Sequence, residues 1–155
     1  MIVVMIYYEY NDFKADIPKL RQQCESFNAD TIIAVARGGM TLAHALSEAL
    51  NIRNVQSIRV ESYDDEHQRE EITIRGSCDL SVSKRVLIVD DIVDSGRTLT
   101  TLMPLLKKNH PDIEFRSAAL FTKSTALIQP DYSLHEAAEW IDFFWGRDFL
   151  KPDLL

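Results

Sequence analysis

A strand that ends in acidic residues constrains the fold of this chain more than any other feature. Residues 85–91, RVLIVDD, form a continuous apolar run that finishes in two aspartates. Residues 92–95 add two apolar residues, a third aspartate and a serine, and residues 96–110 have the spacing of a helix. Apolar runs without polar alternation are typical of strands buried on both faces, as in parallel sheets. The segment therefore predicts a buried strand, a tight turn and a helix.

Strands and helices alternate along the rest of the chain. Apolar residues at helical spacing predict helices over residues 13–28 and 40–50. Short apolar or alternating runs predict further strands over residues 31–36, 55–63, 72–76 and 113–123. This order predicts an α/β fold with a Rossmann-like, mostly parallel sheet and flanking helices on both faces. Ligands bind such sheets beyond the carboxyl ends of the strands.

Other segments do not follow this alternation. Residues 64–71, DDEHQREE, are highly charged without an apolar period, so we expect an exposed loop there. Residues 1–12 begin apolar, lack a basic leader and are too short to span a bilayer, so we expect a strand or a packing arm. The tail from Pro130 contains short strand-like pieces and an aromatic cluster. Pro104 is expected to kink its helix unless it lies near the start.

Composition limits the class of protein. A length of 155 residues with 46% hydrophobic composition suits a single domain with one core. The net charge of −7 argues against a sequence-independent grip on nucleic acid. Cys24 and Cys78 lie far apart without metal-type spacing, which is typical of a reduced, cytoplasmic protein. We therefore expect a cytoplasmic protein that has no membrane span and does not bind nucleic acid.

The acids and the turn after residue 89 form a candidate site. The segment Ser95–Thr98 combines hydroxyls, a glycine and free backbone N–H groups at a helix start, which suits a phosphate. A plain helix N-cap is the alternative, although it needs only one such side chain. Asp90 and Asp91 suit a divalent cation or sugar hydroxyls, while acid–base work and a solvated loop are the alternatives. With the turn 37–39, RGG, nearby, these features suit a phosphorylated sugar with a second anionic group.

Several segments together resemble a known family. Residues 86–98, VLIVDDIVDSGRT, resemble the 5-phosphoribosyl-1-pyrophosphate signature of the type I phosphoribosyltransferases over its whole length. Further segments resemble the family's pyrophosphate loop, flexible loop and base-binding parts, at residues 32–40 (IIAVARGGM), 61–70 (ESYDDEHQRE), 121–123 (FTK) and 139–145 (EWIDFFW). The likeness is greatest to the bacterial xanthine-guanine branch of the 6-oxopurine enzymes. It implies the type I fold, with a core over about residues 13–128 and a small C-terminal hood over about 129–155, which residues 1–12 could join.

The resemblance implies where the sugar substrate binds. Two acids of the family contact the ribose hydroxyls and Mg²⁺, and here the metal ligand would be Asp91. The flexible loop would bring Arg69 to the pyrophosphate. Near Arg37 the family often has a cis peptide after the residue that contacts pyrophosphate. The expected sugar-binding residues are Arg37, Gly38, Arg69, Asp90, Asp91, Asp94, Ser95, Gly96, Arg97 and Thr98.

The resemblance also implies a purine site. Asp94 stands where the 6-oxopurine enzymes carry an aspartate near N7, so it is the expected catalytic general base. Lys123 would donate to O6, Trp140 would stack on the base, and Ile141 would offer backbone groups to the 2-position. Read alone, a tryptophan is more often part of a core. As weaker correspondences, Asp142 would hold a second Mg²⁺ and Arg147 would contact pyrophosphate.

The implied activity is purine salvage. The 5-phosphoribosyl group would pass to N9 of xanthine, guanine or hypoxanthine with Mg²⁺ as cofactor, in a homo-oligomer that is a dimer or a tetramer. Arg97 replaces a glycine of the xanthine-guanine enzymes, and the tail lacks their proline-containing hood, so the preferred purine stays open. The alternatives are a regulator that senses phosphoribosyl pyrophosphate and a transferase for another base.

Overall fold

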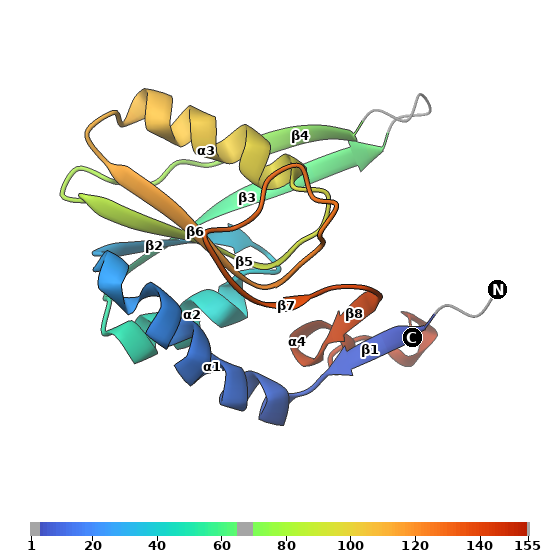
Figure 1. Ribbon diagram of the computed structural model, residues 1–155. Coiled ribbons are helices and arrows are strands. Elements are labelled where there is room, and N and C mark those ends of the chain that lie inside the picture. The colour runs from blue at the N-terminus through green and yellow to red at the C-terminus, as the bar shows by residue number, and fades with distance from the viewer. Residues whose placement is uncertain (1–3, 65–69, 155) are drawn as a thin grey trace.

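The main sheet has six strands, and only one of them runs antiparallel to its neighbour (Figure 1). The computed structural model describes residues 4–64 and 70–154. The strand order is β4-β3-β2-β5-β6-β7, with β4 antiparallel to β3. In chain order the elements are β1 (Met5–Tyr8), α1 (Tyr10–Cys24), η1 (Glu25–Phe27), β2 (Thr31–Ala36), α2 (Met40–Leu50), β3 (Asn54–Asp64), β4 (Glu70–Arg75), β5 (Arg85–Val93), α3 (Arg97–Asn109), β6 (Glu114–Thr122), β7 (Tyr132–Glu136), β8 (Trp140–Phe143), α4 (Phe144–Arg147) and η2 (Pro152–Leu154).

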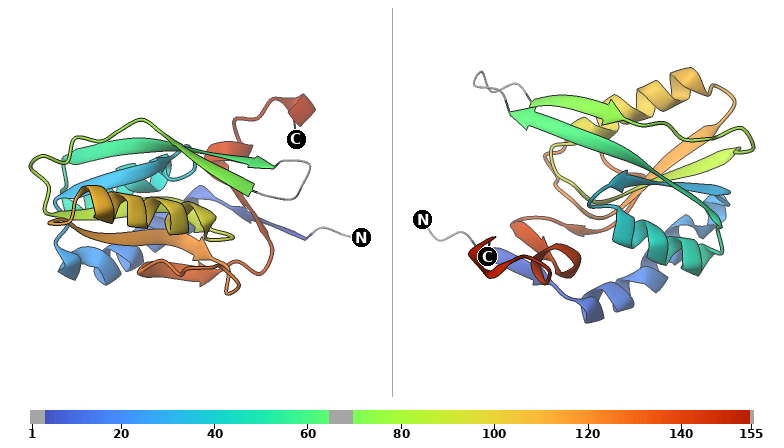
Figure 2. Two further views of the ribbon diagram at one scale, coloured as in Figure 1. Left: turned by 90° about the horizontal axis from the view of Figure 1, so that it is seen from above. Right: turned by 180° about the vertical axis from the view of Figure 1, so that it is seen from behind.

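Helices cover both faces of this sheet, as the alternating sequence predicts. Helices α1 and α2 lie on one face and α3 lies on the other (Figures 1 and 2). The residues of β5 alternate between the two cores: Leu87 and Val89 face α1 and α2, and Val86 and Ile88 face α3. All four side chains are fully buried. The continuous apolar run of β5 is therefore explained by a strand with a core on each side.

A smaller layer, which we call the hood, consists of β1, β8 and α4. Strands β1 and β8 pair in parallel, from Met5 opposite Trp140 to Tyr8 opposite Phe143. The N-terminal strand therefore lies beside a segment near the other end of the chain, below the carboxyl ends of the main strands in Figure 1. Strand β7 belongs to the main sheet, where it pairs with β6.

Most predicted elements form, with shifted ends. The strand 31–36 and the helix 40–50 occur as predicted. Helix α1 starts earlier than expected, because Glu9 and Asp12 form a reciprocal capping box at its first turn. The segment 64–71, expected to be a loop, contributes to β3 and β4 at its two ends, and its residues 65–69 lie outside the described part.

Two further details concern helices. Helix α3 contains Pro104 well inside its span and continues to Asn109. Within residues 4–64 and 70–154, we find no helix with the length and apolar character needed to cross a membrane.

Candidate active site

The acids after residue 89 lie at the carboxyl end of the sheet. Strand β5 extends through Val93, two residues further than the sequence predicts, because Ile92 and Val93 continue the pairing with β6. Asp90 and Asp91 are therefore strand residues and are half-buried. Asp90 Oδ1 accepts the Asp91 amide at 2.9 Å, and Asp91 Oδ1 accepts the Ile92 amide at 2.7 Å.

Burial acts on both acids of this pair, and charge repulsion acts on Asp90. Burial, together with the neighbouring Asp91 carboxylate, raises the pKa of Asp90 well above its usual range. Burial also raises the pKa of Asp91. Two such carboxylates favour a cation or hydroxyl donors beside them. Among the described residues, no group of three or more acidic, histidine or cysteine side chains could hold a metal ion by itself.

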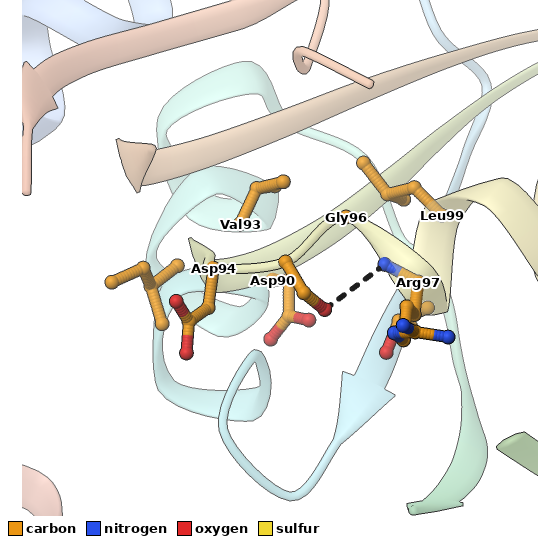
Figure 3. Close-up of a pocket in the computed structure, with 9 residues that line it drawn as sticks. Asp90, Val93, Asp94, Gly96, Arg97 and Leu99 are labelled. Carbon is orange, nitrogen blue, oxygen red and sulfur yellow. Dashed lines mark hydrogen bonds between the residues drawn. The ribbon is translucent and has the colours of Figure 1, made fainter. Parts of the chain in front are cut away.

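The turn after β5 forms a small polar cradle (Figure 3). A cavity of about 130 Å³ is lined by Asp90, Asp94 and the residues from Ser95 to Leu99. The cap of α3 is Gly96, and within the described residues no side chain caps the helix. Ser95 Oγ accepts the Arg97 amide at 3.3 Å. Backbone N–H groups in the first turn of a helix can bind an anion.

Gly96 is required by the shape of this cradle. Its φ of 83° lies in the left-handed region, which glycine adopts without strain. An added Cβ would also lie 3.0 Å from the amide nitrogens of Leu127 and Ile128. The loop that carries those amides is held by a hydrogen bond from Leu127 N to Ser95 O at 2.8 Å. Close backbone contact and a positive φ together fix a glycine here.

The loop between β2 and α2 packs against the acids of β5. The Ala36–Arg37 peptide of this loop is cis. This bond precedes Arg37, whereas the resemblance implies a cis bond after the residue that contacts pyrophosphate. A Cβ on Gly38 would lie 2.6 Å from Asp91 Oδ2, and a Cβ on Gly39 would lie 2.3 Å from the carbonyl oxygen of Val89. Gly39 is a residue that the sequence prediction did not assign to the site, although a second glycine directly before a helix is its signal.

A large cavity opens beside this loop. It has a volume of about 630 Å³, and its lining includes Arg37, Gly38, Asp91 and Arg147. Asp142 also lines this cavity, and two guanidinium groups and two acids around a single cavity suit a diphosphate with a bound cation. We call this space the diphosphate cavity.

A third cavity joins the acids to the hood. It has a volume of about 250 Å³, and its lining includes Asp94, Lys123, Trp140 and Ile141. Lys123 Nζ lies 2.7 Å from Asp94 Oδ1. An ammonium donor and a carboxylate acceptor side by side can bind a flat ring that has an oxygen next to an N–H group. We call this space the base cavity.

The three cavities form one site at the carboxyl ends of β2, β5 and β6. Asp94 lines both the cradle and the base cavity, and Asp91 lines both the base cavity and the diphosphate cavity. Of the residues predicted from the sequence, all but Arg69 line one of these cavities, and Arg69 lies outside the described residues. Glu139 also lines the base cavity, which the sequence prediction missed.

The comparisons with known proteins agree over nearly the whole chain. A family model described as the phosphoribosyl transferase domain matches residues 7–150. A xanthine-guanine phosphoribosyltransferase from Idiomarina loihiensis is 32% identical over 137 residues, which cover 85% of this chain and 81% of that protein.

Solved structures give the same result. A xanthine-guanine-hypoxanthine phosphoribosyltransferase from Helicobacter pylori is 38% identical with a TM-score of 0.86, covering 94% of this chain and 96% of that one. A purine phosphoribosyltransferase from Pyrococcus horikoshii is 33% identical with a TM-score of 0.76, covering 91% of this chain and 93% of that one.

Proposed function

The chain belongs to the phosphoribosyl transferase domain family, and from this premise we propose that it is a 6-oxopurine phosphoribosyltransferase of purine salvage. In this reaction the bond from C1 of 5-phosphoribosyl-1-pyrophosphate to pyrophosphate breaks, and a bond from C1 to N9 of the purine forms. The purine loses a ring proton, and the products are a nucleoside monophosphate and pyrophosphate. The observation that carries the proposal is the Lys123–Asp94 pair in a cavity that also contains Trp140 and Asp91.

The sugar pyrophosphate would bind across the cradle and the diphosphate cavity. In the cradle, the N–H groups of the turn and the start of α3 would receive the 5′-phosphate. The ribose hydroxyls would donate to Asp90 and Asp91, and Asp91 would also hold Mg²⁺, which stabilises negative charge on the leaving pyrophosphate. Arg37, which lines the same cavity, would bind the pyrophosphate.

The purine would bind in the base cavity. Lys123 would donate to O6, and it discriminates against the amino group of adenine, which offers no acceptor at that position. Asp94 would take the proton that the imidazole ring of the purine loses. Trp140, which is 62% exposed and borders this cavity, would stack on the ring. Ile141 would present backbone groups to the 2-position.

The regulator considered from the sequence is less well supported than an enzyme. The matched relatives are named as transferases. We further propose that the protein works in the cytoplasm as a homo-oligomer. Light scattering coupled to gel filtration distinguishes a dimer from a tetramer.

Nucleotide formation tests the proposal. Wild-type protein is incubated with the sugar pyrophosphate, Mg²⁺ and one acceptor at a time: xanthine, guanine, hypoxanthine, adenine, orotate or uracil. We expect product with at least one 6-oxopurine, and we expect Asp94→Ala to lose turnover far more than affinity for the sugar pyrophosphate. No product with any acceptor, while the sugar pyrophosphate still binds, would contradict the enzyme and favour the regulator.

A further inference from the structure

An aspartate in β8 connects the base cavity with the diphosphate cavity. Trp140 and Asp142 stand two positions apart in the strand, so their side chains project from the same face. The indole Nε1 of Trp140 donates to Asp142 Oδ1 at 3.1 Å. Arg147 Nη1 donates to the other oxygen, Oδ2, at 2.5 Å. One carboxylate therefore contacts the ring that borders the base cavity and a guanidinium that borders the diphosphate cavity.

The hydrogen bond matters because Trp140 has little packing to orient it. With 62% of its surface exposed, its ring has rotamer freedom that binding must remove. Its neighbour in the strand, Ile141, is buried and fixes the backbone but not the indole. The bond to Asp142 is charge-assisted, and the Asp142 side chain is only 21% exposed, so the carboxylate is itself well placed.

Arg147 has a support of its own. Tyr7 lies opposite Asp142 in the parallel pairing of β1 with β8. Its hydroxyl donates to Asp148 Oδ1 at 2.7 Å, which ties the residue after Arg147 to β1. Strand β1 thus holds Asp148, the residue next to Arg147. Arg147 binds Asp142, and Asp142 in turn binds the indole of Trp140.

We propose that Asp142 is a positioning residue that orients Trp140 toward the purine. We also propose that Arg147, at the diphosphate cavity, holds the Asp142 carboxylate in the position that orients Trp140. This inference rests on the proposed function. It gives Asp142 a role in addition to the second Mg²⁺ ligand expected from the family resemblance, because its two oxygens accept hydrogen bonds from Trp140 and Arg147. When a diphosphate binds Arg147, the hold on Asp142 and the indole changes, so the two substrates become coupled.

Steady-state kinetics test the positioning role. Asp142→Ala removes both contacts, and we expect KM for the purine to rise about tenfold while KM for the sugar pyrophosphate and kcat change less than about threefold. Asp142→Asn keeps an acceptor for the indole and should restore most of the purine KM. Glu114→Ala, which removes the acid of the exposed Glu114–Arg116 pair at the other end of the sheet, is the matched control. An unchanged purine KM in Asp142→Ala, or an equal loss for both substrates, overturns the proposal.

Trp140 fluorescence tests the same contacts without turnover. The chain has two tryptophans, so the variants are made in a Trp145→Phe background. We expect Asp142→Ala to lower the anisotropy of Trp140 and Asp142→Asn to preserve it. Inorganic pyrophosphate with Mg²⁺ should shift the emission, and Arg147→Met should abolish that shift.

The two measurements separate two failures. Identical anisotropy in all variants overturns the inference, even if the enzyme turns over a purine. A wild-type protein inactive with every acceptor overturns the proposed function, while the fluorescence still decides whether Asp142 orients the indole.

Discussion

At the scale of single residues, the adjacent glycines Gly38 and Gly39 differ in the atoms that an added side chain would contact. A Cβ on Gly38 would press on the end of the Asp91 side chain, 2.6 Å from Oδ2, which can rotate away. A Cβ on Gly39 would meet backbone atoms of β5, 2.3 Å from Val89 O and 2.9 Å from Asp90 Cα. The first contact is with the side chain of Asp91, a proposed site residue, whereas the second is with the backbone of a central strand.

We therefore predict opposite effects of the two alanine substitutions. Gly38→Ala should fold with little change in Tm but lower kcat/KM at least about tenfold, because it displaces Asp91. Gly39→Ala should lower the free energy of unfolding by at least about 2 kcal/mol, because strand backbone cannot yield. Thermal unfolding and the transferase assay measure both quantities. Equal losses of stability in the two variants would contradict this distinction.

Lys123 carries the prediction about purine selection. Its ammonium lies 2.7 Å from Asp94 Oδ1 and is the proposed donor to O6. Lys123→Ala should lower the ratio of kcat/KM for a 6-oxopurine over adenine by about tenfold or more, because adenine lacks the oxygen that this donor serves. Lys107→Ala, on the exposed surface of α3, is the control. A purine preference that survives in Lys123→Ala would exclude this lysine from the base site.

At the scale of elements, the amino ends of β2 and β5 are joined by a carboxylate. Asp30 Oδ2 accepts the amides of Lys84 and Arg85 at 2.8 and 3.0 Å, and Oδ1 accepts Thr31 Oγ1 at 2.7 Å. Burial alone would raise the pKa of Asp30, but these hydrogen bonds outweigh it and lower the pKa below the ordinary 3.8. The proposed catalytic groups lie at the opposite ends of the same strands.

Asp30→Ala should therefore weaken the fold and spare catalysis. Because Asp30 is exposed, we expect a loss of only about 1 kcal/mol in the free energy of unfolding at neutral pH, with kcat/KM unchanged. A lowered pKa stabilises the fold above the ordinary value and loses this effect as pH falls through the folded value. The difference between wild type and variant in urea unfolding should thus shrink below about pH 4. A difference that grows in acid would contradict this assignment.

The sequence predicts elements well where local pattern and environment agree. The strand 31–36 is apolar throughout and is buried, and the helix 40–50 consists of strong helix formers. The end of β5 was predicted too early, because two acids resemble the end of a buried strand although pairing with β6 continues past them. The neighbouring strand, rather than the residues of the strand itself, determines where such a strand ends.

The site divides in the same way. The acids, the cradle and the arginine-glycine turn stand in short contiguous motifs, so the sequence places them together at strand ends. The contacts of Asp142 with Trp140 and Arg147 could not be predicted, because they depend on how β8 and α4 pass between the cavities. Pairing between β1 and β8 joins segments far apart in the chain, and no local pattern specifies such a partner.

At the scale of the whole molecule, one tyrosine fixes the hood to the core. Tyr8 of β1 is 3% exposed, and its ring packs edge-on against Phe121 of β6 and Phe143 of β8, with centroids 5.3 and 5.7 Å away. Its hydroxyl donates to the buried Asp16 of α1 at 2.6 Å. Burial and this carboxylate raise the pKa of the phenol far above its usual range, so the donor persists at all working pH values.

Removing this anchor should loosen purine binding more than sugar binding. Tyr8→Ala should lower the free energy of unfolding by about 3–5 kcal/mol, because a buried aromatic ring is lost. Tyr8→Phe keeps the ring but leaves Asp16 without one donor, so it should cost about 1–3 kcal/mol. In Tyr8→Phe, which should stay folded, KM for the purine should rise more than KM for the sugar pyrophosphate, because the hood strand carries Trp140 while the cradle belongs to β5 and α3. Equal changes in both KM values would instead mean that hood and core respond as one rigid unit, and that Tyr8 contributes stability alone.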